Sequence, residues 1–417
     1  MKTADIQKMA KAAKEASTCA ANLSTTQKNK LLKEMAALLK KETQPLIREN
    51  TKDLSAAKKQ HLPDALIDRL QLNKKRIVEM AQGLLAIIHL PDPVGEIAAS
   101  YKRPNGLKIK KVRIPLGVIG MIFESRPNVI VDAAGLCIKS GNAVILRGGS
   151  EAFHSNQILA KLWQKVLQKN GLPTAIVQTI PNKDHKAIET LLKMDRYVDL
   201  IIPRGGARLM ETVRRHSKIP VLRHDKGICH VYVDDKADLE MAKAIVINAK
   251  TQRPGVCNAM ETLLVSQPIA KKFLPPMIAA LQKRGVEIRG CPTTRKIVPN
   301  IRTASEKDWD TEYLDLILSI RVVKNMEEAI RHIDRHGSLH TETIVTKDKI
   351  RAQIFLRRVT ASVVLHNAST RFNDGFQLGL GAEMGISTTK LHAFGPMGLT
   401  SLTTTKFVVE GSGHLRS

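Results

Sequence analysis

The sequence predicts an α/β fold with two doubly wound units and a small additional β element. From Gly117 to Val233, short apolar runs alternate with helical stretches, a pattern typical of parallel βαβ units. The alternation resumes after Cys257, with predicted strands from 261–265 to 362–365. At 417 residues the chain exceeds what one hydrophobic core usually serves, so two units are expected.

The part of the chain before this alternation is predicted to be helical and then to form a hairpin. Apolar residues recur at helical spacing in four stretches, 4–20, 25–42, 44–58 and 63–90. Within 100–115, Asn105-Gly106 lies between two alternating runs, which is the strongest short signal for a β-hairpin. Because an isolated hairpin is only marginally stable, we expect it to dock on a sheet or on a second subunit.

The composition raises one competing class of function. The chain has 66 Lys and Arg against 39 Asp and Glu, a net charge of +27, which is one footprint of nucleic-acid binding. However, the basic residues are dispersed through the predicted helices, and only 2 Trp and 4 Tyr are available for base stacking. A basic surface suited to anionic substrates is therefore the favoured interpretation, and we expect no nucleic-acid partner.

The cysteines and the N-terminus indicate the compartment. The cysteines are odd in number, widely spaced and without a Cys-x-x-Cys pair, so we expect reduced thiols and no metal site. The N-terminus reads as a charged amphipathic helix, and no apolar run approaches the length of a membrane span. We therefore expect a cytoplasmic protein without a membrane partner. The five cysteines are Cys19, Cys137, Cys229, Cys257 and Cys291.

Cys257 is the strongest candidate for a catalytic residue. It follows a Gly-bearing loop and precedes an apolar strand within 248–265. Loop N–H groups, Lys250 and Arg253 would favour its thiolate, the form that attacks a carbonyl carbon. The alternative is a small buried core residue, which describes most free cysteines. From the residues alone, both interpretations stay open.

Two local repeats indicate a phosphate site. Each runs from an apolar strand through Arg-Gly-Gly into a helix, so that free helix N–H groups and a guanidinium could meet an anion at the carboxyl edge of a parallel sheet. Neither matches Gly-x-Gly-x-x-Gly, and each alone could be an ordinary strand-to-helix turn. Their recurrence favours dinucleotide binding. The residues concerned are Arg147, Gly148, Gly149, Ser150, Arg204, Gly205 and Gly206.

Longer blocks of the sequence are specific enough to compare with known families. The run VRIPLGVIGMIFESRPNV over 112–129 and the block RFNDGFQLGLGAEMGIS over 371–387 are the most distinctive. Further blocks lie in the same order over essentially the whole chain, at 137–151, 224–234, 312–318 and 336–342. Together they resemble the gamma-glutamyl phosphate reductases, a family within the aldehyde dehydrogenase superfamily.

This resemblance implies an aldehyde dehydrogenase-like fold with a particular division of the chain. An NADPH-binding domain would cover 1–230, a catalytic domain 231–400 and a C-terminal oligomerisation segment 401–417. The hairpin 100–115 would belong with that last segment to an oligomerisation element. A homo-oligomer is therefore expected.

The resemblance also implies a reaction and roles for two residues. The activity would be NADPH-dependent reduction of L-glutamyl 5-phosphate to L-glutamate 5-semialdehyde and phosphate, the second step of proline biosynthesis, with functional coupling to glutamate 5-kinase. Cys257 would carry the thioester. The side-chain amide of Asn128 would join the backbone N–H of Cys257 in binding the oxyanion.

Further binding residues follow from the same resemblance. Arg147 stands where many superfamily members carry a Lys that holds the adenosine ribose, and a guanidinium there would suit the 2′-phosphate of NADPH. Glu312 resembles the carboxylate that holds the nicotinamide ribose, with an ordinary surface acid as the alternative. Arg253, Asn373 and Asp374 are expected to contact the substrate.

One departure from the superfamily bears on the mechanism. The segment 224–227, His-Asp-Lys-Gly, stands where hydrolytic aldehyde dehydrogenases carry Glu-Leu-Gly-Gly, whose Glu activates water. Its absence fits an enzyme that exchanges its thioester with phosphate. His224 could act as a base, although a structural or substrate-contact role is favoured. A hydrolytic aldehyde dehydrogenase is the alternative function.

Overall fold

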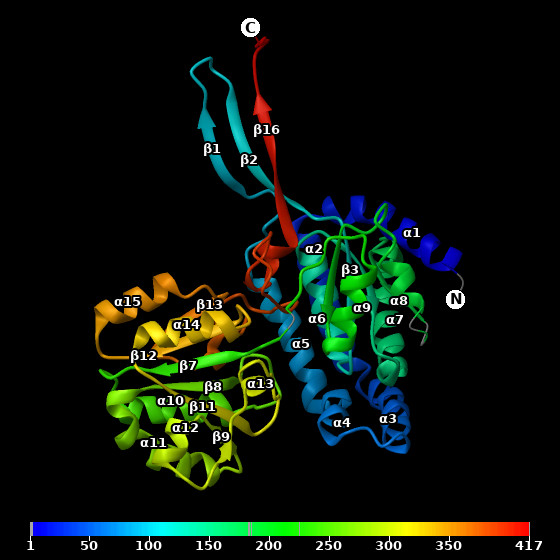
Figure 1. Cartoon of the computed structure of the whole chain (residues 1–417). Helices are drawn as coiled ribbons and strands as arrows, with labels where there is room; N and C mark the ends of the chain where they lie inside the picture. The colour runs from blue at the N-terminus through cyan, green and yellow to red at the C-terminus, as the bar shows by residue number, and fades with distance from the viewer. Residues whose placement is uncertain (1–2, 182–183, 185, 225, 417) are drawn as a thin grey trace. The chain divides into compact units, whose positions relative to one another are not determined.

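The computed structural model divides into two compact units, each described here by itself (Figure 1). The structure describes residues 3–181, 184, 186–224 and 226–416. Unit 1 comprises Met1–Arg223, Gly379–Gly385 and Met397–Ser417, and unit 2 comprises His224–Leu378 and Ile386–Pro396. Each unit contains a parallel sheet with helices on both faces, which confirms the predicted doubly wound α/β fold.

Unit 1 is built on a four-stranded parallel sheet in the order β5-β4-β3-β6. Its strands are β3 (Val118–Phe123), β4 (Ala143–Arg147), β5 (Val177–Thr179) and β6 (Leu200–Arg204). All residues of β3 and β4 are buried, as expected for strands covered on both faces. Because β4 and β6 lie on either side of β3, the chain reverses its direction of winding there, and the carboxyl end of β3 is a topological switch point.

Helices cover both faces of this sheet. Val118 and Ile122 share a core with α1, α8 and α9 on one face, and α6 and α7 pack against the strands from the other. The bounds are α1 (Thr3–Ala21), α6 (Asn128–Lys139), α7 (Phe153–Lys169), α8 (Lys186–Leu191) and α9 (Ala207–His216). Four further helices belong to this unit, namely α2 (Thr25–Lys41), α3 (Thr43–Lys59), α4 (Asp64–Leu70) and α5 (Lys74–His89).

The stretch 63–90, predicted as one helical region, is two helices in the structure. The chain leaves helical geometry after Leu70, and Asn73 starts α5 by accepting a hydrogen bond from the Arg76 N–H at 2.9 Å. An asparagine favours such a cap over a position inside a helix, which accounts for the break.

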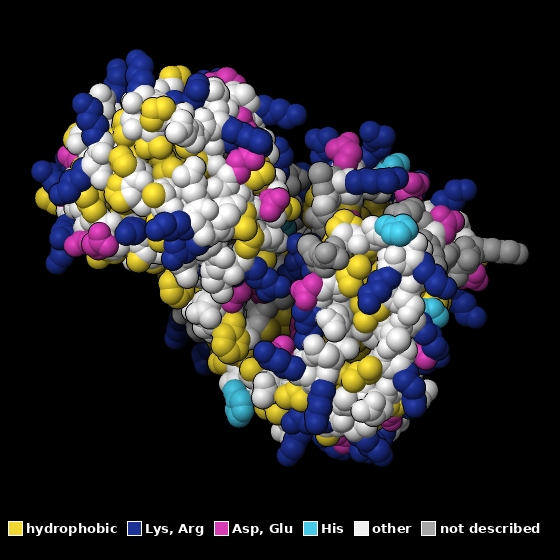
Figure 2. Space-filling model, turned by 90° about the horizontal axis from the view of Figure 1, so that it is seen from below, with side chains coloured by type: hydrophobic (Ala, Val, Ile, Leu, Met, Phe, Trp, Pro, Cys, Tyr) yellow, Lys and Arg dark blue, Asp and Glu magenta, His cyan; other side chains and the backbone are white. Residues whose placement is uncertain are grey.

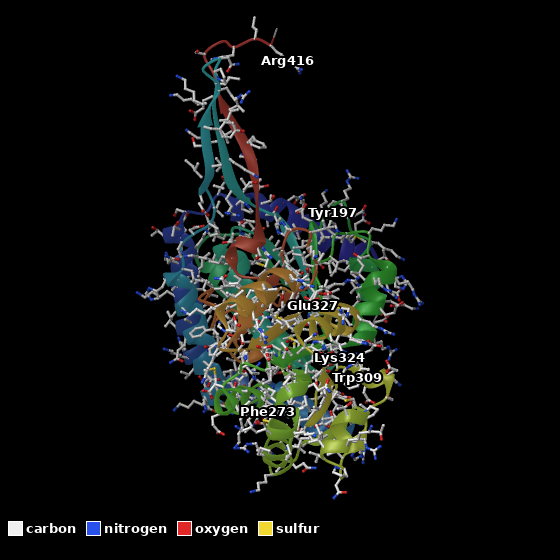
Figure 3. The ribbon with its side chains drawn as sticks, turned by 60° about the vertical axis from the view of Figure 1, so that its left-hand side comes forward. Tyr197, Phe273, Trp309, Lys324, Glu327 and Arg416 are labelled. Atoms are coloured by element: carbon white, nitrogen blue, oxygen red, sulfur yellow. The ribbon has the colours of Figure 1, made fainter. Side chains whose placement is uncertain are left out.

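A three-stranded antiparallel arm extends from the body of unit 1 (Figure 1). It consists of β1 (Ile97–Lys102), β2 (Lys108–Pro115) and β16 (Thr403–Glu410), with β2 in the middle. The hairpin at Asn105-Gly106 is confirmed, and its glycine has a positive φ of 97°. The arm side chains stand clear of the rest of unit 1 and Arg416 lies beyond its outer end (Figure 3), while Ile97 and Phe407 are 54% and 62% exposed.

Unit 2 contains a seven-stranded sheet in the order β10-β9-β11-β8-β7-β12-β13, with all neighbours parallel. The strands are β7 (Cys229–Val233), β8 (Met260–Ser266), β9 (Glu287–Gly290), β10 (Arg302–Thr303), β11 (Ile317–Val323), β12 (Thr341–Val345) and β13 (Val363–His366). The strands β9 and β10 were not predicted, because runs of four and two residues are too short to show a periodic pattern.

Two helical layers cover this sheet. Val231 and Val233 pack with α10 and α11 on one face, and Tyr232, which points to the other face, packs with α14 and α15. The helices are α10 (Leu239–Thr251), α11 (Gln267–Gln282), α12 (Pro292–Ile297), α13 (Glu306–Trp309), α14 (Met326–His336) and α15 (Lys349–Arg358).

The surface agrees with the predicted dispersal of positive charge. Lys and Arg side chains are scattered over the face in Figure 2 and do not gather into one patch. Within the described ranges, no helix combines the length and the apolar character that crossing a bilayer requires.

Asp199 connects three elements of unit 1. Its carboxylate accepts hydrogen bonds from the Val118 N–H at 2.7 Å and from the Lys14 ammonium at 2.8 Å, which links α1 to the starts of β3 and β6. Gly117 precedes β3 with φ of 122°, and a Cβ built there would lie 2.2 Å from a carboxylate oxygen of Asp199. Position 117 therefore requires glycine for both its backbone geometry and the space around it.

We expect Gly117→Ala to lower the free energy of unfolding by about 3 kcal/mol, because backbone strain and displacement of Asp199 add together. The measurement is a urea unfolding curve followed by circular dichroism. Gly171→Ala is the matched control, since Gly171 also has a positive φ of 68° but nothing lies within 4 Å of its built Cβ. That variant should cost about 1 kcal/mol, and equal losses would contradict the crowding argument.

Candidate active site

Cys257 lies in a turn between α10 and β8, at the amino edge of the seven-stranded sheet. It is partly exposed, whereas Cys137, Cys229 and Cys291 are buried. The predicted position in a loop before a strand is confirmed. The alternative of a fully buried core residue does not fit this exposure.

Gly227 packs directly against the backbone of Cys257. A Cβ built on Gly227 would lie 2.0 Å from the Cys257 carbonyl oxygen and 2.8 Å from its Cα. The backbone of Gly227 also lies close enough to the carboxylate of Glu312 to affect its pKa. Burial raises the pKa of Glu312, and the Gly227 N–H and the Lys226 ammonium oppose that rise. Gly227 thus lies next to both Cys257 and Glu312, two of the predicted site residues.

Two neutral side chains lie beneath the Cys257 loop. The Cys229 thiol donates to the Cys257 carbonyl at 3.2 Å and lies 3.6 Å from Nδ1 of His340. Burial, with Glu342 adding to it, raises the pKa of Cys229 well above its usual value, so this thiol stays protonated. Burial, with His224 adding to it, lowers the pKa of His340 to about 3, so its imidazole is neutral. Neither group therefore competes with Cys257 as a nucleophile or charged base.

The residues of the segment after β13 brace the same loop. The buried side-chain amide of Asn373 donates a hydrogen bond to Oγ1 of Thr341 at 2.7 Å. The backbone carbonyl of Asn373 accepts one from Nδ2 of Asn258 at 2.8 Å. Asp374 is partly buried and accepts the N–H groups of Phe376 and Gln377. Asn373 therefore holds the residue that follows Cys257, while Asp374 closes its own turn.

Lys250 does not supply the positive charge expected for the Cys257 thiolate. It is fully buried, and its ammonium pairs with the buried carboxylate of Glu261 at 2.6 Å. Burial raises the pKa of Glu261 to about 7, with Lys250 opposing this rise. The sequence reasoning missed this partner because Glu261 comes from the neighbouring strand β8. Arg253, by contrast, is exposed, and it lies on the same loop as Cys257.

Arg371 is a residue near Cys257 that the sequence reasoning did not assign. It lies in the short helix η3 (Thr370–Phe372), and its Nε donates to Oε1 of Gln252 at 2.7 Å. Burial lowers the pKa of Arg371, Arg253 adds to the effect, and Cys257 is among the groups that oppose it. Its presence in the block 371–387 was the available signal, but its partner Gln252 is the residue that follows α10, over a hundred residues earlier.

In unit 1, both Arg-Gly-Gly turns lie at the carboxyl edge of the four-stranded sheet, as predicted. Arg147 and Arg204 end the strands on either side of β3. Gly148, Gly149 and Ser150 continue from the first strand, and Gly205 and Gly206 continue from the second into α9. The two turns therefore flank the switch point, where open α/β sheets bind ligands.

A carboxylate lies in each of these turns. The Gly206 N–H donates to Oε2 of Glu124 at 2.9 Å, and a Cβ on Gly205 would lie 2.6 Å from the Glu124 carboxyl carbon. Glu151 lies within 2.4 Å of a Cβ built on Gly149. These glycines thus leave room for a negatively charged group close to the backbone, which a phosphate would also require.

Arg147 and Asn128 already have partners within unit 1. Arg147 is 4% exposed and donates to the Gly148 carbonyl at 3.0 Å. Burial lowers its pKa, and the carboxylates of Glu151, Asp184 and Glu124 oppose this. Asn128 is the first residue of α6, and its Nδ2 donates to Asp132 at 2.9 Å.

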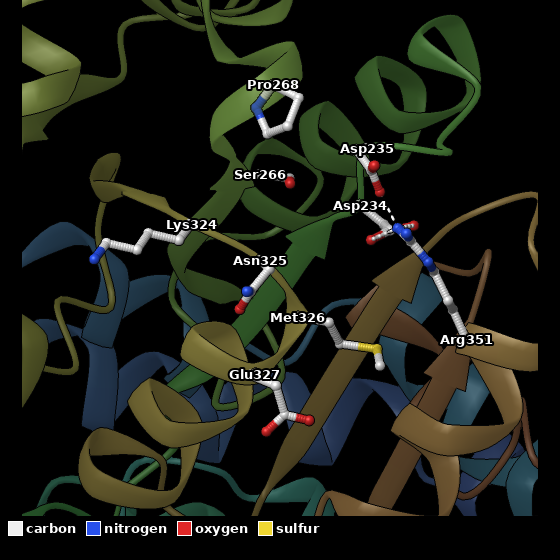
Figure 4. Close-up of a pocket in the computed structure, with 9 residues that line it drawn as sticks. All are labelled: Asp234, Asp235, Ser266, Pro268, Lys324, Asn325, Met326, Glu327 and Arg351. Atoms are coloured by element: carbon white, nitrogen blue, oxygen red, sulfur yellow. Dashed lines mark hydrogen bonds and ion pairs between the residues drawn. The ribbon is translucent and has the colours of Figure 1, made fainter.

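A separate cavity of about 240 Å³ lies at the carboxyl edge of the unit 2 sheet (Figure 4). Arg351 points at Asp234 and Asp235, and Glu327 pairs with Arg358. This edge is opposite to the one that carries Cys257, and the cavity contains no nucleophilic thiol. Elsewhere among the described residues, no group of three or more His, Cys, Asp or Glu is arranged to hold a metal ion.

Comparison with known proteins identifies the family. The profile of the Aldehyde dehydrogenase family matches residues 1–304. A gamma-glutamyl phosphate reductase of Desulfatibacillum aliphaticivorans is 57% identical over 409 residues, 98% of each chain, and one of Geobacter metallireducens is 54% identical over 99% of this chain and 98% of its own. The crystal structure of gamma-glutamyl phosphate reductase from Thermotoga maritima has a TM-score of 0.96 at 46% identity, covering 99% of this chain and 100% of that one. The chain therefore belongs to the gamma-glutamyl phosphate reductase family, within the aldehyde dehydrogenases.

Proposed function

We propose that this chain reduces L-glutamyl 5-phosphate to L-glutamate 5-semialdehyde and phosphate with NADPH, through a thioester on Cys257. The observation that carries the proposal is the partly exposed Cys257, held against Gly227 beside Glu312, in a chain whose relatives bear the name gamma-glutamyl phosphate reductase. In the pathway to proline, glutamate 5-kinase would supply the acyl phosphate.

In this mechanism the Cys257 thiolate attacks the acyl carbon of the substrate. A carbon–sulfur bond forms, the bond from that carbon to the phosphate oxygen breaks, and its electron pair leaves with phosphate. The backbone N–H of Cys257 and the amide of Asn128 are the proposed donors to the oxyanion. For Asn128 to act, its hydrogen bond to Asp132 must be exchanged for one to the substrate.

The residues of the chain fit a nicotinamide dinucleotide. The Gly206 N–H already binds a carboxylate, so its turn can receive a phosphate once Glu124 moves aside. Arg147 would meet the 2′-phosphate, and Glu312 would hold the nicotinamide ribose. When bound, NADPH would supply a hydride to the thioester carbonyl carbon.

The remaining assignments follow from the same proposal. Arg253 and Asp374 would contact the substrate, and Asn373, whose side chain is buried, would contribute by holding Asn258. The cofactor domain (1–230) and the catalytic domain (231–400) would act together in the cytoplasm. The exposed apolar side chains of the arm and the segment 401–417 would form the contact between subunits of a homo-oligomer.

We expect Cys257→Ala to lower kcat by about 10⁴-fold or more, because no other described thiol at this edge can form the thioester. The assay is phosphate-dependent oxidation of glutamate 5-semialdehyde with NADP⁺. Cys19→Ala is the control, since Cys19 is also partly exposed but lies on α1. Turnover retained by Cys257→Ala would eliminate the thioester mechanism.

We expect oxidation of the semialdehyde to require phosphate or arsenate. The segment 224–227 has no Glu to activate water, and Asp225 lies outside the described residues. The ring of His224 packs edge-on against the ring of His340, with 5.8 Å between the ring centroids. Without a base for water, the rate in phosphate-free buffer should be lower by about 100-fold. Equal rates with and without phosphate would favour a hydrolytic aldehyde dehydrogenase instead.

We expect Arg147→Gln to raise KM for NADPH about tenfold or more while KM for NADH changes little, because only NADPH carries the 2′-phosphate. Arg147→Lys keeps the charge but loses the planar fork, so it should fall between. The measurement is steady-state kinetics with both cofactors. An equal rise in both KM values would mean that Arg147 stabilises the turn and does not bind the 2′-phosphate.

A further inference from the structure

Residues 371 and 373 form hydrogen bonds with the residues on either side of Cys257. Before the cysteine, Gln252 accepts a hydrogen bond from Nε of Arg371 at 2.7 Å. After it, Asn258 donates to the carbonyl of Asn373 at 2.8 Å. Because these anchors flank Cys257, the Arg371 side chain is tied through Gln252 to the loop that carries the nucleophile. Its orientation is fixed through Nε, which leaves the terminal amino groups of the guanidinium for another partner.

The positive charge beside this loop is not balanced by the nearby acid. Arg253 and Arg371 repel each other strongly enough to add to the lowering of the Arg371 pKa that burial causes, and Asp374 opposes it. Arg253 is exposed, and its guanidinium has no hydrogen-bond or ion-pair partner among the described residues. Lys250 is neutralised by Glu261. Once the Cys257 sulfur is acylated and carries no charge, two arginines near the single carboxylate of Asp374 favour an additional anion.

We propose that Arg371, together with Arg253, binds the phosphate group beside Cys257, both as the leaving group of the acyl phosphate and as inorganic phosphate in the reverse reaction. This inference rests on the proposed function and names the residues of its phosphate site. Planar guanidinium groups match phosphate oxygens in pairs, which makes arginine well suited to the task.

The chemistry of the substrate favours phosphate over its other anion, the α-carboxylate. The phosphate is attached through one oxygen to the carbon that the Cys257 sulfur attacks, so it must lie within a few bonds of that sulfur. The α-carboxylate is separated from the same carbon by three carbon atoms. A cation held against the Cys257 loop is therefore placed for the phosphate.

The first test is kinetic, with the intact protein oxidising glutamate 5-semialdehyde at varied phosphate. Arg371→Gln should raise KM for phosphate about tenfold or more, and Arg371→Lys should raise it less, while KM for the aldehyde and NADP⁺ stays within about twofold. Arg357→Gln, an exposed arginine of α15 with no described partner, is the matched control. Its KM values should match those of the wild type.

The second test does not depend on turnover. Without cofactor, Cys257 is alkylated with anionic iodoacetate or neutral iodoacetamide, and mass spectrometry identifies the modified cysteine. The wild type should favour iodoacetate relative to Arg371→Gln by severalfold, and inorganic phosphate should remove this preference by occupying the same cations. This readout separates the inference from the proposed function, because a chain with no phosphate-dependent activity could still show the phosphate effect.

Three results would overturn the inference. A rise in KM for the aldehyde with KM for phosphate unchanged would assign Arg371 to the α-carboxylate. A fall in kcat and melting temperature, with KM for phosphate and the iodoacetate preference unchanged, would assign it to a structural role. An iodoacetate preference that phosphate does not alter would mean that no phosphate binds at these cations.

Discussion

The contact between Gly227 and the backbone of Cys257 is the constraint on which the proposed site depends. A side chain at position 227 would occupy the space of the Cys257 carbonyl, since even a Cβ would lie 2.0 Å from that oxygen. The backbone of the same glycine lies close enough to the carboxylate of Glu312 to lower its pKa. One residue without a side chain therefore allows the Cys257 backbone to approach closely, and it lies beside the acid proposed to hold the cofactor.

Several side chains around the Cys257 loop are uncharged or paired, whereas two arginines remain positively charged. Beneath it, burial keeps Cys229 protonated and His340 neutral, so the support carries no net charge. On the α10 side, Lys250 is neutralised by Glu261. Positive charge remains with Arg253 and Arg371, the two residues proposed to bind the phosphate group. A nucleophilic thiolate that packs on uncharged side chains and has cations beside it would suit the proposed acyl phosphate substrate.

The anion site proposed in unit 1 is of a different kind. Its two Arg-Gly-Gly turns flank the end of β3, and the glycines admit the carboxylates of Glu124 and Glu151 close to the backbone. Since Glu124 takes the Gly206 N–H, a dinucleotide phosphate would have to replace it there. In the proposed function, arginine side chains of unit 2 would bind the substrate phosphate, and the backbone of a strand-to-helix turn in unit 1 would bind a dinucleotide phosphate.

Local patterns in the sequence determined the buried strands, the hairpin at Asn105-Gly106, and the position of Cys257 in a loop before β8, because burial and turns follow from the spacing of nearby residues. The family resemblance added Glu312. Only the tertiary structure decided which strands became neighbours, and hence that Lys250 would be neutralised by Glu261 and that Arg371 would reach Gln252. Such pairings depend on sheet order and close packing between distant segments, and the spacing of residues along the chain does not encode them.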